Sequence, residues 1–295
     1  MGGAVHKLGR QEEGECQDSD VEMLNARVVG QTVDITSIVD APIITPGNQL
    51  VMAVNDLFVA CHSQRTRVSV STAKDFIGKR KKAVPKNVAN KYRNWANTRT
   101  KGLPRELKLF VGMPVIVTTN IKTELGITNG TMGVVKSIHF KNGQVINEDT
   151  GVHYLEEHPD YIIVELDDIN VEPLHGLPPN HIPIVPVKKS FSVHMPGRKK
   201  AVNVNRNHFP LVPHYSCTAH KSQGKTLSKA IVDLVPLKTK GIGIEFAYVP
   251  LSRVRRLEDL TILRPFHPFI LNAKVNQGCA AMMEEFKQRD LCKDM

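Results

Sequence analysis

The segment Ala219–Thr226, with the sequence AHKSQGKT, fits a loose phosphate-loop pattern of Gly or Ala, four residues, then Gly-Lys-Ser/Thr. In a phosphate loop, backbone N–H groups and the lysine, here Lys225, bind the β- and γ-phosphates of a nucleotide. The strict pattern begins with Gly, whereas this segment begins with Ala219. In a phosphate-loop protein a carboxylate on a later strand also holds Mg²⁺. Asp233 follows the segment too closely to leave room for a normal crossover helix before that strand. The residues alone leave open a phosphate loop and a polar loop that opens a helix.

A strongly basic segment is a second candidate for chemistry. Residues 79–108 contain eleven Lys or Arg against one acid, and they include Tyr92 and Trp95. Basic side chains interleaved with aromatic rings are typical of single-stranded nucleic-acid binding, where the rings stack on bases. The whole chain has 39 basic and 29 acidic residues and a net charge of +10, which also favours a polyanionic partner. A solvated basic loop is the alternative, for this segment and for the basic residues 188–206.

Several other classes of protein and site are excluded or find no support. No run approaches ~18 consecutive apolar residues, so we expect no membrane-spanning helix, and the N-terminus lacks the apolar core of a signal peptide. Five cysteines without a C-x-x-C pair argue against a disulfide scaffold and for a reducing compartment. The histidines match no metal-binding spacing, so the sequence predicts no metal site among His153, His158, His175 and His181.

The elements that must position these residues follow an α/β order, interrupted in the middle. Residues 20–29 predict a short helix and 41–45 a buried strand that stops at Pro46-Gly47. Helical spacing over 49–61 puts Leu50, Val54, Leu57 and Phe58 on one face. Short β-like runs then predict a small barrel or sandwich: residues 111–119, 133–140, 161–166, 182–187 and 190–193. A helix start at Lys225, a strand at 230–234, a helix at 246–252 and a strand at 260–263 return to α/β character.

In this order, three segments resemble motifs V and VI of the superfamily-one DNA helicases: Thr218–Leu227, Ala230–Leu234 and Ala247–Leu260. The branch most similar is the Pif-type helicases, with RecD-like and Helitron-type helicases as relatives. Residues 20–29, 42–45 and 48–55 resemble the start of that family's second RecA-like domain. Residues 110–117, Asn120, 125–126 and 129–135 resemble its inserted SH3-like barrel. The resemblance covers about residues 20–265.

This resemblance implies an α/β fold, in which a RecA-like domain with a parallel sheet contains an inserted small β-barrel of SH3-like type. The implied domains are an N-terminal tail (1–19), a first RecA-like segment (20–106), the barrel (107–212), a second RecA-like segment (213–268) and a C-terminal tail (269–295). The implied function is the C-terminal part of an ATP-dependent, 5′-to-3′ DNA helicase. Its partners would be single-stranded DNA and a separate first RecA-like domain, with no membrane, and it would act inside the cell, in the nucleus or a mitochondrion.

The same resemblance assigns roles to individual residues. Arg253 would be the arginine finger, a catalytic residue that stabilises charge on the γ-phosphate, unless it forms a surface salt bridge to Glu258 or Asp259. The resemblance places Gly224 and Lys225, with Arg253, at the nucleotide. In the resemblance, DNA would be bound by Thr218, His220, Ser222 and Gln223. Tyr92 and Trp95 are added as DNA contacts because they lie in the basic segment 79–108, not because of the resemblance.

The sequence also departs from the family pattern. It contains neither the strict Gly-x-x-x-x-Gly-Lys-Thr loop nor the Asp-Glu pair of a first RecA-like domain. ATP and Mg²⁺ would therefore bind only together with that missing domain, and we expect no ATP turnover by this chain alone. Pro250 stands where the family more often has Ala, which puts the aim of Arg253 in question. The alternatives are an inactive DNA-binding or partner-binding helicase remnant, and a phosphate-loop NTPase that uses Lys225.

Overall fold

A computed structural model describes most of the chain, and its contacts divide the chain into two units. Unit 1 comprises residues 1–54 and 215–295, and unit 2 comprises residues 55–214. Residues 55–106, which the sequence assigns to the RecA-like domain, are thus grouped with the β-rich residues. The predicted tails 1–19 and 269–295 lie largely outside the described residues. The described residues are 16–30, 41–78, 81–141, 150–167, 169, 173–197, 200–237 and 242–272.

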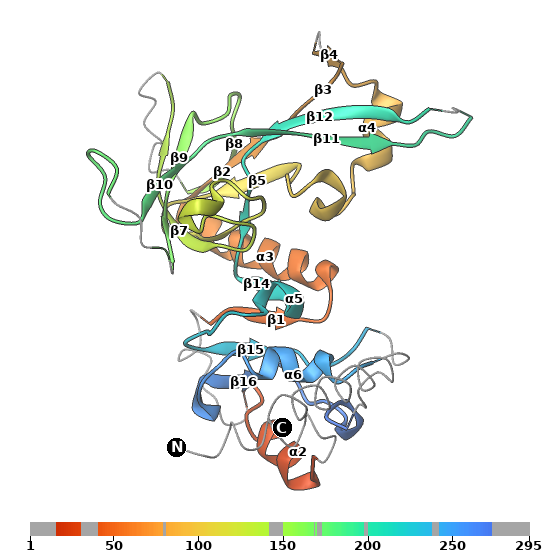
Figure 1. The fold of residues 1–295 in the computed structure, drawn as a ribbon, viewed down its shortest axis with the longest axis vertical. Coiled ribbons are helices and arrows are strands. Elements are labelled where there is room, and N and C mark those ends of the chain that lie inside the picture. The colour runs from red at the N-terminus through yellow and green to blue at the C-terminus, as the bar shows by residue number, and fades with distance from the viewer. Residues whose placement is uncertain are drawn as a thin grey trace, which may run out of the picture. The chain divides into compact units, whose positions relative to one another are not determined.

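Unit 1 contains a four-stranded parallel sheet in the order β14-β1-β15-β16 (Figure 1). Its strands are β1 (Ile43–Thr45), β14 (Ser216–Thr218), β15 (Ala230–Val232) and β16 (Leu260–Ile262). Every position of β1, β15 and β16 is buried. Short runs of this kind, apolar on both faces, are typical of parallel strands that are covered on both sides. The predicted α/β fold with a parallel sheet is therefore confirmed.

Helices from both ends of the chain complete unit 1. They are α2 (Asp18–Asn25), α3 (Asn48–Ser63), α5 (Ala219–Ser222) and α6 (Glu245–Leu251), with 3₁₀ turns η4 (Leu257–Asp259) and η5 (Pro268–Ile270). Val21 of α2, Ala247 of α6 and Ile270 of η5 join one buried apolar cluster with Ile44 and Val232 of the sheet. This packing, rather than helix propensity, must stabilise elements as short as these. α3 contains the unit boundary after Val54.

One prediction about the helices is wrong, and another helix is confirmed. No helix begins at Lys225: the only helical turn in this region is α5, which ends before Gly224. The helix predicted over 49–61 is α3. Its buried residues are Asn55 and Val59, whereas Leu57, on the predicted apolar face, is 62% exposed. α3 is apolar almost all round, so its periodicity does not single out one face.

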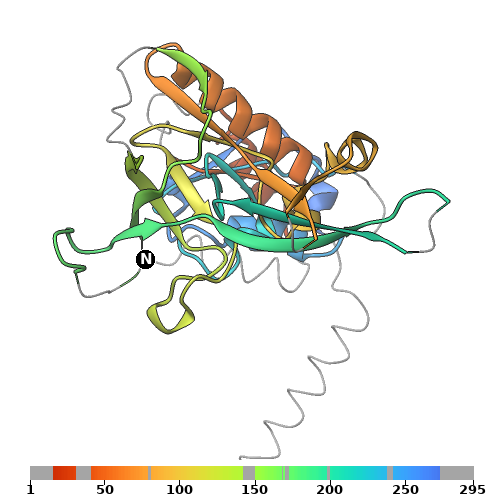
Figure 2. The same cartoon turned by 90° about the horizontal axis from the view of Figure 1, so that it is seen from above.

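Unit 2 is built from three sheets, which Figure 2 shows from above. An antiparallel sheet contains β10 (His181–Ile184), β9 (Tyr161–Leu166), β7 (Met132–His139), β6 (Pro114–Val117) and β13 (Leu211–Pro213). A second contains β11 (Val187–Val193), β12 (Val202–His208), β3 (Lys74–Ile77) and β4 (Lys82–Ala83). A third contains β5 (Glu106–Leu109), β2 (Arg67–Thr72) and β8 (Gly151–Tyr154). Among the described strands no pairing joins β10 to β13, so the SH3-like barrel stays a prediction.

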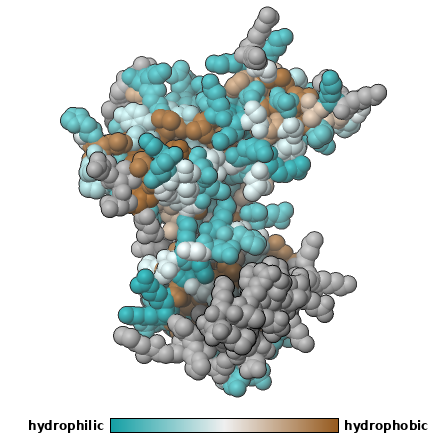
Figure 3. Space-filling model, viewed as in Figure 1, coloured by the Kyte–Doolittle hydropathy of each residue, from teal (hydrophilic) through white to brown (hydrophobic). Residues whose placement is uncertain are grey.

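One helix and two 3₁₀ turns connect the strands of unit 2: α4 (Lys86–Tyr92), η2 (Asn97–Thr100) and η3 (Thr123–Leu125). β11 and β12 form a long hairpin that lies beside α4 (Figures 1 and 2). Their outward residues are polar, and Figure 3 shows hydrophilic side chains over most of the described surface on this face of the molecule, with small hydrophobic areas between them. None of the described helices is long and apolar enough to span a bilayer.

Candidate functional site

The segment 218–226 lies at the carboxyl end of β14, where the parallel sheet of unit 1 ends. Thr218 is the N-cap of α5, a single helical turn, and Gly224 then adopts φ +76°, a left-handed conformation that L-residues with a side chain rarely adopt. The chain reaches β15 without another helix. The segment is therefore a tight polar turn at the edge of the sheet, the position where α/β folds commonly bind ligands.

The four residues predicted to contact DNA in this segment differ in exposure. The side chains of His220 and Gln223 are exposed and Thr218 is half-buried, so these three can meet a ligand at the surface. Ser222 is buried, and its hydroxyl donates to the Ala219 carbonyl at 2.8 Å. Ser222 thus stabilises the turn of α5, and a contact with DNA would have to use its neighbours.

The Arg253 side chain lies against this turn. Its Nη1 donates to the carbonyl oxygens of Ser222 at 3.3 Å and Lys225 at 3.1 Å. Its Nε donates to the Val249 carbonyl at 2.7 Å, and its Nη2 donates to Ser252 Oγ at 2.6 Å. The structure therefore brings the predicted finger together with the predicted nucleotide-contacting Lys225 and Gly224. Arg253 forms no ion pair with Glu258 or Asp259 among the described residues, and Glu258 pairs with Arg256 at 3.0 Å.

Pro250 shapes the element that carries Arg253. It lies inside α6 and is buried. Because proline has no N–H, it cannot make the hydrogen bond to the residue four positions earlier, and the helix ends one residue later. The Arg253 side chain then occupies the Val249 carbonyl at this helix end, a common way to satisfy terminal carbonyls. With proline at 250, Arg253 still reaches the turn.

The Asp233 carboxylate is paired with Arg264. It is buried at the end of β15 and accepts two hydrogen bonds from Arg264, from Nε and from Nη2, each at 2.9 Å. Its Oδ1 also accepts the Val235 N–H at 3.1 Å. Asp233 is therefore occupied rather than open to Mg²⁺. Since no helix follows Gly224 either, the phosphate-loop NTPase that uses Lys225 is wrong for this chain.

In unit 2, Tyr92 and Trp95 occupy different environments. Tyr92 is 5% exposed, and its hydroxyl donates to Asp75 Oδ2 at 3.0 Å. Burial first, and then the Asp75 charge, raises the pKa of Tyr92. Arg206, 2% exposed, holds the same carboxylate with two hydrogen bonds of 2.8 Å. Tyr92 therefore supports the fold from inside, whereas Trp95 is half-buried and reaches the surface.

Unit 2 also contains a buried polar cluster that the sequence does not predict. Ser71 Oγ lies 2.8 Å from His158 Nδ1, and His208 Nε2 lies 3.0 Å from the Ser71 carbonyl. Burial lowers the pKa of both histidines, that of His208 to about 3. Ser71 is 1% exposed, so this serine–histidine pair has no access to a substrate. The three residues are far apart in the sequence, and no spacing signal could have grouped them.

The chain is similar in sequence and in fold to Pif1 helicases. No protein-family model matches it. It is 29% identical over 182 residues to the ATP-dependent DNA helicase Pif1 of Psychrobacter sp. (strain PRwf-1), a match that covers 54% of this chain and 26% of that protein. The chain thus spans about a quarter of that relative.

Solved structures share the fold. Bacteroides Pif1 bound to single-stranded DNA matches with a TM-score of 0.63 and 17% identity over 97% of this chain and 54% of that chain. Bacteroides Pif1 in complex with ADP-AlF3 and single-stranded DNA matches with a TM-score of 0.59 and 17% identity over the same shares. The chain therefore corresponds to about half of each structure. The resemblance to Pif-type helicases, predicted from the motifs, is confirmed.

Proposed function

We propose that this chain, similar in sequence and fold to part of a Pif1 helicase, supplies one wall of an ATP site and part of a single-stranded DNA track. Thr218, His220 and Gln223 would bind DNA phosphates, because polar side chains at a turn suit contacts that carry position rather than base sequence. Gly224 and Lys225 would lie near the γ-phosphate, and Arg253 would stabilise the charge that develops there.

The observation that carries this proposal is the position of Arg253. Its guanidinium group is hydrogen-bonded to the carbonyls of Ser222 and Lys225, between the predicted DNA contacts and the predicted nucleotide contacts. A movement of Arg253 toward a phosphate would release this turn, and a movement of the turn would displace Arg253. The arrangement therefore supports a coupling between nucleotide and DNA.

A complete ATP site would need a separate first RecA-like domain, with a strict phosphate loop and a carboxylate for Mg²⁺. In the described part of this chain, no group of three His, Cys, Asp or Glu side chains is arranged to hold a metal ion. We therefore expect ATP and Mg²⁺ to bind between the two domains, and hydrolysis to require both. The 5′-to-3′ direction is part of the same proposal and rests on the resemblance.

The proposal is tested by DNA binding to the chain as it exists. Fluorescence anisotropy of a labelled single-stranded oligonucleotide should show binding that weakens steeply with salt. Gln223→Ala should lower the affinity about fivefold, the effect of one polar contact of roughly 1 kcal/mol. Gln64→Ala, the same change at an exposed position of unit 2, is the matched control and should have no effect. Absence of binding at low salt would overturn the proposal.

A second candidate function is a helicase remnant that binds DNA or a partner without taking part in hydrolysis. The four hydrogen bonds of the Arg253 guanidinium favour it, because they give this residue a structural role that needs no nucleotide. Hydrogen exchange at the amides of residues 222–227 separates the two candidates. Millimolar ATP with Mg²⁺, added together with a separate first RecA-like domain, should slow this exchange if the turn contacts phosphate, and it should have no effect on a remnant.

A further inference from the structure

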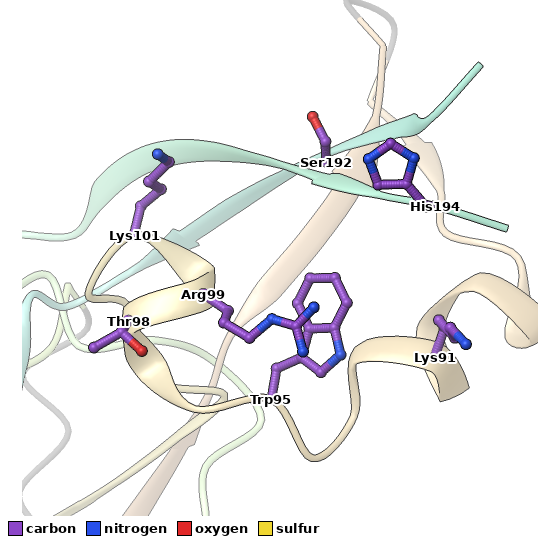
Figure 4. A pocket seen from close by; sticks show the side chains of 7 residues that line it. All are labelled: Lys91, Trp95, Thr98, Arg99, Lys101, Ser192 and His194. Carbon is purple, nitrogen blue, oxygen red and sulfur yellow. The ribbon is translucent and has the colours of Figure 1, made fainter. Parts of the chain in front are cut away.

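A basic pocket with an aromatic side chain lies in unit 2, within the α4–η2 segment and the β11 strand. Its cavity volume is about 320 Å³, at the lower end of the range for ligand sites. Figure 4 shows Trp95 in the middle, with the Arg99 side chain across its ring. The lining residues are Lys91, Trp95, Thr98, Arg99, Lys101, Ser192 and His194.

The charge of this pocket is of one sign. Lys91, Arg99 and Lys101 are exposed, and none of them forms an ion pair with a carboxylate in the part of the chain that the structure describes. No acidic residue lines the cavity. Cations that converge on one cavity without a counter-charge attract an anion there, and phosphate is the anion that Lys and Arg bind most generally.

The aromatic wall is rigid and flat. Trp95 packs against the buried cluster of Tyr92 and Phe191, with ring centroids 6.2 Å apart in each case. Tyr92 is fixed in turn by its hydrogen bond to Asp75. Arg99 Cζ lies over the Trp95 ring, 4.0 Å from its centroid, in a cation–π contact. Both an indole and a guanidinium can stack on a nucleobase, and this wall is already ordered before a ligand arrives.

Lys101 has a backbone conformation that is rare for residues other than glycine. It ends η2 with φ +57°, in the left-handed region that few residues other than glycine occupy. Such a conformation persists only where its surroundings enforce it, and it occurs preferentially at functional sites. Here it lies at the turn that brings the Lys101 side chain to the pocket.

We propose that this pocket binds one nucleotide of a single DNA strand, as a second DNA contact apart from residues 218–223. The base would stack on the Trp95–Arg99 wall, and Lys91 and Lys101 would bind the flanking phosphates. An acidic peptide would satisfy the lysines but would leave the flat wall without a partner, so the combination favours a nucleotide. The inference rests on the proposed binding of single-stranded DNA.

Trp95 is the sole tryptophan of the chain, so intrinsic fluorescence reports on this pocket alone. Titration with an unlabelled dT oligonucleotide of about 16 nucleotides should change the emission, with the same midpoint as anisotropy of a labelled strand. Binding without any change in emission would overturn this inference and leave the proposed function intact. Loss of both signals would overturn both. An equal response to dTMP at the same nucleotide concentration would overturn the assignment to a strand.

Two sets of variants test the contacts themselves. Lys91→Ala with Lys101→Ala should make the slope of log K against log[salt] shallower by about 1.4, because each phosphate contact on a single strand contributes ~0.7. Lys74→Ala with Lys122→Ala removes the same charge at two exposed lysines outside the pocket and is the control. An equal change in both double variants would contradict the site. Trp95→Leu should weaken binding about 5- to 150-fold, and Trp95→Phe should restore part of the loss if stacking, rather than folding, is responsible.

Discussion

Replacement of Arg253 by alanine tests the link between α6 and the 218–226 turn. The guanidinium donates to the Ser222 and Lys225 carbonyls, and it also engages Val249 and Ser252. Hydrogen bonds that involve a charged group contribute about 1.5–3 kcal/mol each in buried sites. Because Arg253 is partly exposed, we expect Arg253→Ala to lower the free energy of opening this turn by about 2–3 kcal/mol in total.

Hydrogen exchange followed by mass spectrometry measures this opening directly. Exchange of the amides in residues 222–227 should accelerate about 30- to 150-fold in Arg253→Ala, the equivalent of 2–3 kcal/mol. Arg253→Lys should give nearly the same result, because one ammonium nitrogen cannot replace the three guanidinium nitrogens that donate to four separate acceptors. The affinity for single-stranded DNA should fall as well, since the predicted contacts lie on the same turn.

Arg256→Ala is the control for this experiment. Arg256 follows three residues later and is largely exposed, and its ion pair with Glu258 is of the surface type that contributes about 0–1 kcal/mol. If Arg253→Ala and Arg256→Ala give the same exchange rates at residues 222–227, Arg253 does not hold the turn and our account of its role is wrong.

Further predictions concern buried groups. Asp75→Ala should lower the free energy of unfolding in urea by about 3–5 kcal/mol, because Arg206 would remain buried without its carboxylate; a loss below about 1 kcal/mol would contradict this. The pKa of His208 is about 3 in the folded chain against 6.5 as the ordinary value, so the unfolded chain binds an extra proton between these values. Stability should therefore fall as the pH drops through this window, by up to about 1.4 kcal/mol per pH unit, and His208→Gln should flatten the dependence in urea titrations at several pH values; an unchanged slope would argue against it. Burial raises the pKa of the Cys217 thiol to about 11, so at pH 8 iodoacetamide should modify the exposed Cys61 of the folded chain far faster, and equal rates would refute the burial of Cys217.

Local patterns predicted the elements well. The apolar run before Pro46-Gly47 is β1, the helical spacing after it is α3, and the short β-like run at 161–166 is β9 with the same bounds. In these segments the hydrophobic pattern and the flanking turn residues agree with the final structure, so tertiary contacts do not override the local preference. The run near Lys225 failed because the same polar residues suit a helix start and a tight turn, and Gly224 decides between them with its left-handed backbone.

The site could be predicted only in part. Motif order indicated that Arg253 and Lys225 serve one function, and the structure places them together. Arg253 Nη1 donates to the backbone carbonyls of Ser222 and Lys225. Because every residue has a backbone carbonyl, the residue types in the sequence do not indicate these partners. Composition likewise indicated Tyr92 and Trp95 as a pair of aromatic residues. Which of the two faces solvent depends on Asp75 and Arg206, and Arg206 is 131 positions from Asp75.

The strand order of unit 1 has a consequence for the ribosome-bound chain. β1 is made before residues 55–214, and its neighbours β14 and β15 are made only after them. Arg27 Nε donates to the Leu260 carbonyl, which is made still later, 233 positions downstream. During synthesis the β-rich residues 55–214 therefore emerge and can acquire structure while the first strand of the parallel sheet still has no neighbour to pair with. The short apolar strand β1 must remain unpaired through this interval, which makes the nascent chain, rather than the finished protein, the state most exposed to aggregation and to chaperones.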